Sequence, residues 1–240
     1  GDTGTNMVFT LMPVITDIKD MVPDQAGKTM SLIANTALES ARGNSGTIIA
    51  QFYYGLSKSF RGLNQINVKQ FAVGLMQGYQ SSIESLVKPE EGTIITVMRD
   101  VANKANTLAN EGCIDFVPFV KEIFKESEHS LKLTKTTLKI LRKSDVVDSG
   151  ALGFVLLIQG VLNTLEQGDG GRIQTTHLDI SYELEKIESL NKDIDFKIEN
   201  KFCTECVVTG ENISRKELRS KIKDFGDSMV IAGSQKRTPA

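Results

Sequence analysis

Cysteine and histidine are both scarce in this sequence. Of its 240 residues only three are cysteines, Cys113, Cys203 and Cys206, an odd and sparse set that cannot form a disulfide framework. Such a set suits a reducing compartment. The two histidines, His129 and His177, stand singly in polar surroundings, and neither is close in sequence to a plausible nucleophile. We therefore interpret both as solvated side chains rather than as catalytic groups.

An excess of one charge and long apolar runs are also missing. The chain has 28 Lys and Arg against 30 Asp and Glu, a formal net charge of -2, so it lacks the broad basic surface of a nucleic-acid-binding protein. We find no window with the roughly 18 apolar residues that a membrane span needs, and no charged leader before an apolar segment at the amino terminus. We expect a globular, cytoplasmic protein with no nucleic-acid partner and no membrane span.

The common phosphate-binding motifs are absent as well. The sequence contains neither Gly-x-x-x-x-Gly-Lys-Ser/Thr nor the Gly-x-Gly-x-x-Gly of protein kinases. Instead, short loops of glycine, Asp, Asn and hydroxyl residues recur where helical patterns begin, at residues 1–7, 42–46, 91–93 and 148–150. Taken singly, each loop is also ordinary turn and helix-capping chemistry. A nucleotide would therefore have to bind here through another kind of fold.

Helical periodicity dominates residues 1 to 166. Apolar residues recur there at helical spacing, and no segment alternates as a strand would. Pro13 lies inside the first helical pattern and removes a backbone hydrogen bond, so we expect a kink or a later start. Two separate segments are expected around residues 116–124 and 134–141, and the most apolar helix at 151–165. The pattern predicts an all-α antiparallel bundle or barrel with short connections.

The remaining residues predict a different organisation. Residues 167–200 are charged and low in apolar content, which is typical of a linker. Within residues 201–240, strand-like segments at 201–209 and 228–232 flank a helix at 214–225. We predict the start of an α+β domain that is not complete in this stretch, because two strands and one helix bury little surface.

Two helix starts have an explicit capping signal. Asn67 with Gln70, and Ser214 with Glu217, each have the spacing of a capping box. The first residue is a different case, because Gly1 opens a loop that normally follows an anchoring element. We expect that native sequence precedes it.

The four glycine-containing loops are expected to converge. Consecutive antiparallel helices bring alternate loops to the same end of a bundle, and each helix amino terminus favours an anion by about 0.3 to 1 kcal/mol. A triphosphate with magnesium would suit such a rim, with Asp2 as the candidate ligand for the hard cation. The other candidate ligands are Thr3, Gly4, Thr5, Asn6, Asn44, Ser45, Gly46, Thr93, Asp148, Ser149 and Gly150. For Asp148 to Gly150 two interpretations stay open, a helix cap or a nucleotide contact.

The Cys203-x-x-Cys206 pair is a weaker candidate site. It could be half of a zinc site or a redox pair, but no second Cys or His pair follows it. In a strand, positions three apart point to opposite faces, so one metal ion could not easily use both sulfurs. We favour a plain buried cysteine, with Cys203 the better single zinc candidate.

Four short motifs occur in the order and spacing of one family, and two more resemble the start of a further domain of that family's members. They are Gly-Asp-Thr-Gly-Thr-Asn-Met at 1–7, Ala-Arg-Gly-Asn-Ser-Gly at 41–46, Glu-Gly-Thr-Ile at 91–94, Val-Val-Asp-Ser-Gly at 146–150, Phe-Cys-Thr-Glu at 202–205 and Phe-Gly-Asp-Ser at 225–228. The chain resembles the nucleotide-binding domain related to the L subunit of dihydroxyacetone kinase. In particular it resembles the ATP-binding subunit of bacterial fatty acid kinase, whose middle domain the last two motifs resemble.

The resemblance implies a fold and a ligand set. The family fold is a barrel of eight antiparallel helices that binds ATP or ADP with two magnesium ions. It assigns Asp2 to the metal, with a further Asp just before Gly1 in the family's longer motif. Thr3 to Asn6, Asn44-Ser45 and Thr93 would hold phosphates, and Asp148 to Gly150 would close on the nucleotide. In the family's zinc-bearing middle domain, Cys203 matches the cysteine, while the two histidine ligands are not in this chain.

The resemblance also implies an activity. The expected reaction transfers the γ-phosphoryl group of ATP to the carboxylate of a fatty acid on a separate fatty-acid-binding protein, giving an acyl phosphate for phospholipid synthesis. Arg142, close in sequence to the Asp148 loop, is a candidate for stabilising the transferred charge. Two alternatives remain, the nucleotide subunit of a dihydroxyacetone-type kinase and a nucleotide-binding scaffold without turnover. A homodimer through domains outside this stretch is also consistent with the family.

Overall fold

The computed structural model describes residues 3–19, 24–167, 214–226 and 229–231, with isolated positions at 204, 206, 208, 210 and 233. Helices account for most of these residues. They are α1 (Thr3–Lys19), α2 (Ala26–Glu39), α3 (Gly43–Ser59), α4 (Val68–Ser85), α5 (Ile94–Asn110), α6 (Phe116–Thr137), α7 (Lys139–Ser144), α8 (Ser149–Gln167) and α10 (Arg215–Ile222).

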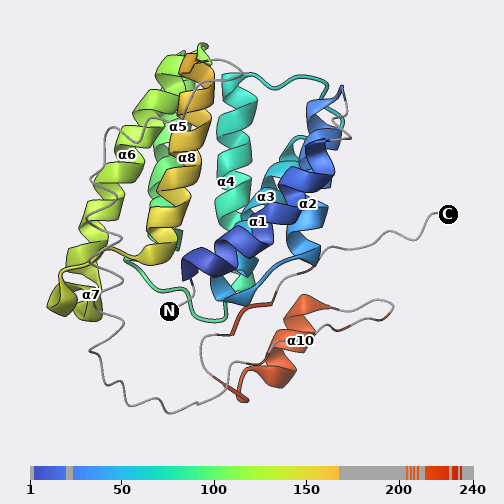
Figure 1. The fold of residues 1–240 in the computed structure, drawn as a ribbon, viewed down its shortest axis with the longest axis vertical. Helices are drawn as coiled ribbons and strands as arrows, with labels where there is room; N and C mark the ends of the chain where they lie inside the picture. Colours follow the sequence, from blue (N-terminus) through green and yellow to red (C-terminus); the bar gives the residue numbers. More distant parts are fainter. Residues whose placement is uncertain are drawn as a thin grey trace.

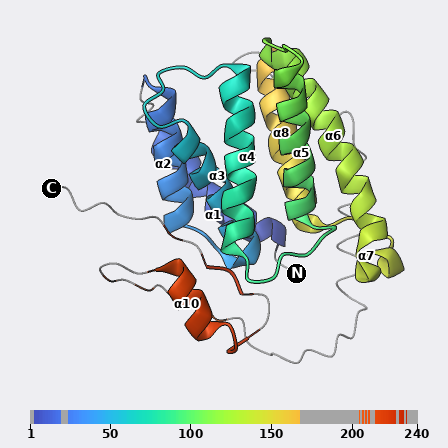
Figure 2. The same cartoon turned by 180° about the vertical axis from the view of Figure 1, so that it is seen from behind.

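The first eight helices pack as an elongated antiparallel bundle. Helices α1, α3, α5 and α8 run in one direction, and α2, α4 and α6 return in the other (Figures 1 and 2). Connections within the described range are short, so helices adjacent in sequence are also neighbours in space. The all-α prediction for this part of the chain is confirmed.

A single large apolar cluster holds the bundle together. Among its fully buried side chains are Ile49 and Phe60 from α3 and its C-cap, Met98 from α5, Phe119 from α6 and Leu152 from α8. Removing each such side chain from water stabilises the fold by about 1.5 to 3 kcal/mol. Small residues bring the backbones close: a Cβ at Gly55 of α3 would lie 2.2 Å from the carbonyl oxygen of Gln77 in α4.

Local sequence signals give mixed results. The capping box of α4 is confirmed, since Gln70 N–H donates to Asn67 Oδ1 (2.9 Å) and Asn67 N–H donates to Gln70 Oε1 (3.0 Å). The later start expected from Pro13 is wrong, because α1 runs from Thr3 to Lys19 with Pro13 inside it. The proline leaves the carbonyl of Phe9 without its helical donor, yet the apolar packing of α1 on both sides of that position keeps the helix continuous.

The two segments expected at residues 116–124 and 134–141 are wrong in extent. They are replaced by one 22-residue helix, α6, and the short α7. The polar side chains that interrupt the apolar pattern lie inside the bundle. Ser127 and Thr134 are buried and donate to the carbonyls of Phe124 (2.6 Å) and Leu131 (2.7 Å) three residues earlier. Hydroxyls that bond within their own helix can occupy a buried face without an apolar signal.

The carboxyl-terminal segment contacts the bundle where α4 ends. Val230 forms an antiparallel bridge with Leu86, in which Val87 N–H donates to Met229 O (3.2 Å) and Ile231 N–H donates to Ser85 O (2.9 Å). Ser214 caps α10 by accepting from Glu217 N–H at 3.4 Å, which is one half of the predicted capping box, while the Glu217 carboxylate pairs with Lys221 (2.8 Å). Figure 1 shows α10 below the end of the bundle at which α4 ends. The linker predicted at 167–200 lies, from residue 168 on, outside the described residues, as does most of the strand predicted at 201–209.

Candidate functional site

The amino termini of α1, α3, α5 and α8 all lie at one end of the bundle (Figure 1). This end, which we call the rim, therefore gathers the four glycine-containing loops of the sequence. Helix amino termini carry partial positive charge and N–H groups with no partner inside the helix. The rim consists of two corners, one formed by α1 with α3 and the other by α5 with α8.

At the α1–α3 corner the Asn6 side chain, in the first turn of α1, packs against Gly43, the first residue of α3. Gly43 has φ +58, a left-handed conformation that favours glycine, and a Cβ there would lie 2.4 Å from Asn6 Nδ2. Thr10 connects the two elements: its hydroxyl donates to Asn6 O (2.7 Å) and accepts from Arg42 N–H (3.1 Å). Asn6 is thereby held directly over the first turn of α3.

The first turn of α3 is not capped by a side chain of its N-cap residue, Arg42. Asn44 is exposed and Ser45 half-buried in that turn, and Gly46 packs against Thr10, where a Cβ would lie 2.1 Å from the hydroxyl oxygen. Of the α1 candidates, Gly4 and Thr5 are exposed and Thr3 and Asn6 half-buried. The structure thus brings together the predicted residues of α1 and α3.

At the α5–α8 corner one carboxylate caps two helices. Asp148 Oδ1 accepts from Ala151 N–H in α8 (2.8 Å) and from Ile94 N–H in α5 (3.0 Å). Asp148 N–H itself donates to Thr134 Oγ1 (3.1 Å), which ties the same residue to α6. Of the two interpretations of this loop, the geometry shows the cap, and a nucleotide contact by Asp148, Ser149 or Gly150 stays a prediction.

The environment of Asp148 shifts the pKa of its carboxyl group. Burial raises the pKa of the carboxyl above its ordinary value of 3.8, and the backbone hydrogen bonds from Ala151, Ile94 and Gly150 oppose that shift. Its charge is neutralised by N–H dipoles rather than by a cation.

The Glu91–Thr93 loop is fixed by a polar network that sequence reasoning missed. Glu91 accepts from the Thr96 hydroxyl (2.8 Å) and from Arg99 Nη1 (2.7 and 2.8 Å), and these partners lower its pKa, with the Thr96 bond the larger cause. Arg99 Nε also donates to Asp100 (3.1 Å), whose other oxygen accepts from Ser130 (2.7 Å). No motif spacing signals such a network, because it joins the loop to two helices.

Thr93 lies at the amino end of α5 as predicted. It is the N-cap residue and provides no side-chain cap bond, because its hydroxyl donates backwards to Glu90 O (2.8 Å). Gly92 precedes it with φ +83 and packs against the Thr137 side chain at the end of α6. The loop is therefore braced from behind, and because the Thr93 hydroxyl donates to Glu90 O, its contact with a phosphate stays a prediction.

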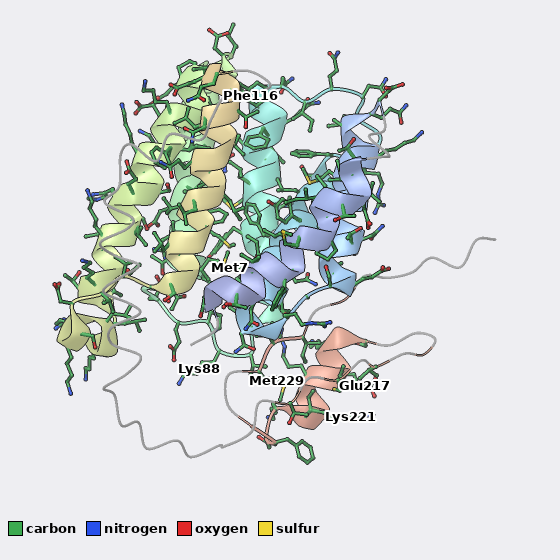
Figure 3. All side chains as sticks on the ribbon, viewed as in Figure 1. Met7, Lys88, Phe116, Glu217, Lys221 and Met229 are labelled. Carbon is green, nitrogen blue, oxygen red and sulfur yellow. The ribbon has the colours of Figure 1, made fainter. Side chains whose placement is uncertain are left out.

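The two corners are joined through α1 and α8. Met7 is only 5% exposed, and its sulfur lies where a Cβ at Gly153 would come within 2.6 Å. Figure 3 labels Met7 between the two helices. The absence of a side chain at Gly153 therefore sets the distance between the two halves of the rim.

Of the remaining predicted residues, the structure describes Arg142 alone. Arg142 donates through Nε to Thr136 O (3.1 Å) and through Nη2 to the same oxygen, so its guanidinium binds the carboxyl end of α6. Its role in charge stabilisation stays a prediction. Asp2 and Cys203 lie outside the described residues.

The described residues of the rim are better suited to bind the phosphate groups of a nucleotide than to bind the metal ion that accompanies them. The rim offers N–H groups, amides and hydroxyls, which are donors to phosphate oxygens. Within the described part of the chain no group of three or more His, Cys, Asp or Glu could hold a metal ion. Asp2 therefore remains the residue of this chain to which a magnesium ion is assigned by prediction, and the zinc expectation has no structural support.

Known proteins match the chain over nearly its whole length. It is 32% identical over 241 residues to protein YloV of Bacillus subtilis (strain 168) and 34% identical over 248 residues to an uncharacterized protein of Staphylococcus saprophyticus. Each match covers 98% of this chain and 43% of the relative. The chain thus spans less than half the length of the curated relatives it matches.

A family model accounts for the helical part. Residues 1–163 match the DAK2 domain, a span that runs from the opening loop into α8 and contains all four loops of the rim. DAK2 domains are the parts of kinase subunits that bind ADP or ATP with Mg²⁺, and they work with a subunit that binds the acceptor. This chain belongs to the DAK2 domain family.

Proposed function

We propose that the protein is an ATP-dependent phosphotransferase that phosphorylates the carboxylate of a fatty acid held by a separate binding protein. The observation that carries the proposal is the convergence of four helix amino termini on one rim, with the Asn6 side chain packed against Gly43 at the start of α3. A triphosphate carries several negative charges at once, and a site built from several helix ends favours it over a singly charged anion.

The acceptor is inferred from the second part of the chain. The matches to the longer relatives continue past residue 163, where the DAK2 match ends, through the Phe-Cys-Thr-Glu motif at 202–205. A domain attached in this way supports a fatty acid kinase subunit over a free-standing dihydroxyacetone kinase subunit.

The proposed chemistry is positioning and charge neutralisation. A carboxylate oxygen of the fatty acid attacks the γ-phosphorus, the bond to the β,γ-bridging oxygen breaks, and ADP leaves with that oxygen. N–H groups at the start of α3, with Asn6, Asn44 and Ser45, would donate to the phosphate oxygens and fix them for in-line attack. Magnesium bound with the nucleotide supplies further neutralisation, and Asp2 is the residue proposed to hold it.

Asp148 has a positioning part in this proposal. By bonding Ile94 N–H and Ala151 N–H it fixes the starts of α5 and α8, and with them Thr93 and Ser149, at one place on the rim. Its Oδ1 already fills the anion-attracting position of that corner. We therefore assign the phosphates to the α1–α3 corner.

The test uses the protein as its own gene encodes it, with Mg-ATP and a fatty acid loaded on its binding protein. Hydroxylamine converts an acyl phosphate into a hydroxamate, which is measured by mass spectrometry. We expect hydroxamate that depends on ATP and falls at least about tenfold in Asn44→Ala, as expected for loss of a bond to a charged phosphate. Asn110→Ala, at the far end of α5, is the matched control and should leave the rate unchanged.

Two outcomes would contradict the proposal. Phosphorylation of dihydroxyacetone with no hydroxamate would replace the acceptor by a hydroxyketone. Nucleotide binding without transfer to either acceptor would indicate a scaffold.

A further inference from the structure

The carboxyl end of α4 is only partly capped by its own residues. The last carbonyls of a helix have no donor within it, and many helices satisfy them through a left-handed residue that follows. Leu86, the C-cap of α4, is instead extended (φ -87, ψ 138), and its N–H donates to Ile83 O (3.2 Å). The Ser85 hydroxyl donates to Ser82 O (2.6 Å). The carbonyls of Glu84 and Ser85 therefore need donors from elsewhere.

Those donors come from the second part of the chain. Arg219 of α10 donates through Nη2 to Glu84 O, and Ile231 N–H donates to Ser85 O (2.9 Å). Arg219 also places a cation at the negative end of the helix dipole. Figure 3 labels Met229, two residues before Ile231, below the end of the bundle. We call α10 together with residues 229–231 the capping segment, because it completes the cap of α4.

The loop that starts at this cap ends at the rim. Residues 86–93 connect α4 with Thr93, the N-cap of α5. Pro89 lies in the middle of the loop, and its fixed φ and the restriction on the residue before it make the loop stiff there. The next carbonyl, that of Glu90, accepts from the Thr93 hydroxyl (2.8 Å). A shift of the loop at its α4 end therefore moves the acceptor that orients Thr93.

The other end of the loop is held by the bundle itself. Glu91 bonds to Thr96 and Arg99 of α5, and Gly92 N–H donates to the Thr96 hydroxyl oxygen (2.8 Å). The loop is thus anchored at one end by α5 and at the other by the capping segment. The capping segment lies outside residues 1–163, the part that matches the DAK2 domain. One anchor of the rim therefore comes from the second part of the chain.

We propose that Arg219 and Ile231 are positioning residues for the nucleotide, because by capping α4 they fix the loop 86–93 and with it Thr93. The inference rests on the proposed binding of a nucleotide at the rim. The capping segment is either docked on α4 or released from it, and a nucleotide that contacts the rim favours the docked state. Linkage is reciprocal, so docking strengthens nucleotide binding by the same factor by which the nucleotide strengthens docking. The second part of the chain is thereby coupled to the nucleotide site through α4.

The first experiment measures the Mg-ADP affinity of the full gene product by calorimetry. Arg219→Gln removes the cation from Glu84 O, and we expect the affinity to fall at least about threefold. Arg219→Lys keeps a cation at this end of α4 and should stay within about 1.5-fold of the wild type. Lys221→Gln is the matched control, because it removes the same charge from the same helix at a residue that pairs with Glu217. Its affinity should equal that of the wild type.

A second measurement needs no substitution. Hydrogen–deuterium exchange of the gene product, followed by mass spectrometry, compares the protein with and without Mg-ADP. Exchange at Ile231 should slow at least about fivefold with the nucleotide, because its N–H is bonded to Ser85 O in the docked state. Cys113, at the opposite end of the bundle, is the control. Its N–H bonds Leu108 O (3.0 Å), and its exchange should not change.

Each other outcome overturns the proposal. If Arg219→Gln binds Mg-ADP as tightly as the wild type, or if the nucleotide slows exchange at Thr93 but not at Ile231, the capping segment only supports the fold. An equal loss of affinity in Lys221→Gln would reduce the effect to net charge.

Failure of the proposed function gives a different result. If Mg-ADP slows exchange nowhere on the rim, the nucleotide site itself is wrong and the coupling falls with it. Acyl phosphate is not a readout of either experiment, so a wrong acceptor would leave both tests unaffected.

Discussion

The two corners of the rim are built from the same parts but differ in what occupies them. At the α5–α8 corner, Asp148 places its own carboxylate on the N–H groups of Ile94 and Ala151. At the α1–α3 corner, the N-cap Arg42 gives no side-chain cap, and Asn6, Asn44 and Ser45 gather around the first turn of α3. One corner stabilises the fold with an internal anion, and the other is the one to which the proposed function assigns the phosphates.

The largest expected effect is on the self-capped corner. Asp148→Ala removes the acceptor for two backbone N–H groups, so we expect the free energy of unfolding to fall by about 2 to 3 kcal/mol. Asp148→Asn keeps an oxygen that can accept both bonds and should lose less than half as much. Urea denaturation of both variants measures the difference. Equal losses would show that charge rather than hydrogen bonding matters at this corner.

The α1–α3 corner is tested by adding a Cβ at Gly43. Gly43→Ala places a Cβ 2.4 Å from Asn6 Nδ2 in a left-handed backbone, so it should cost about 1 to 2 kcal/mol and weaken Mg-ATP binding at least about tenfold. Gly62→Ala is the matched control, because φ is also positive there (+79) and no atom lies within 4 Å of the new Cβ. We expect it to cost about 1 kcal/mol with unchanged nucleotide affinity, measured by calorimetry. Equal affinity losses would refute a ligand role for the α1–α3 corner.

The pH dependence of the free energy of unfolding reports on Asp148, the ionisable group of the α5–α8 corner. The folded protein holds the Asp148 proton more tightly than the unfolded chain does, because the folded pKa is raised above 3.8. As pH rises from below 3.8 to above the raised value, the unfolded state ionises first and the wild type loses stability relative to Asp148→Asn. Urea denaturation of both proteins between pH 3 and pH 7 should show their free energies of unfolding converging or crossing as the pH rises. If the stability advantage of the wild type over Asp148→Asn grew with rising pH, the prediction would be contradicted.

The smallest effect concerns the loop before α5. Glu91 has a lowered pKa in the folded state, so its contribution is present above its ordinary value of 4.5 and is lost as pH falls through the folded value. Its carboxylate is well exposed, so Glu91→Gln should change stability at pH 7 by less than about 1 kcal/mol. The control is Glu122→Gln, because Glu122 is also an exposed carboxylate in an ion pair, in its case with Lys125. A loss above 2 kcal/mol would show that the Glu91–Arg99 network carries part of the fold.

Much of the fold follows from local patterns. The capping box at Asn67, the helix through residues 94–110 and the apolar helix after Asp148 are each determined by side chains a few positions apart. The inference that alternate loops share one end of the bundle needed only short connections. Where buried Ser127 and Ser130 bond inside the bundle, the apolar pattern is interrupted without interrupting the helix, and the prediction at α6 failed for that reason.

The sequence by itself determined the helices, their alternating directions and the residue types available at the rim, because these depend on periodicity and on loop length. The tertiary structure decided which partner each of those residues has. Asp148 could be seen as a cap for its own helix three residues away, but its bond to Ile94 spans 54 residues and exists only once α5 and α8 pack together. The exposed apolar side chains of α1, Val8, Met12 and Ile15, have the same origin, since apolar content predicts a covered face and only the packing shows that these side chains are exposed.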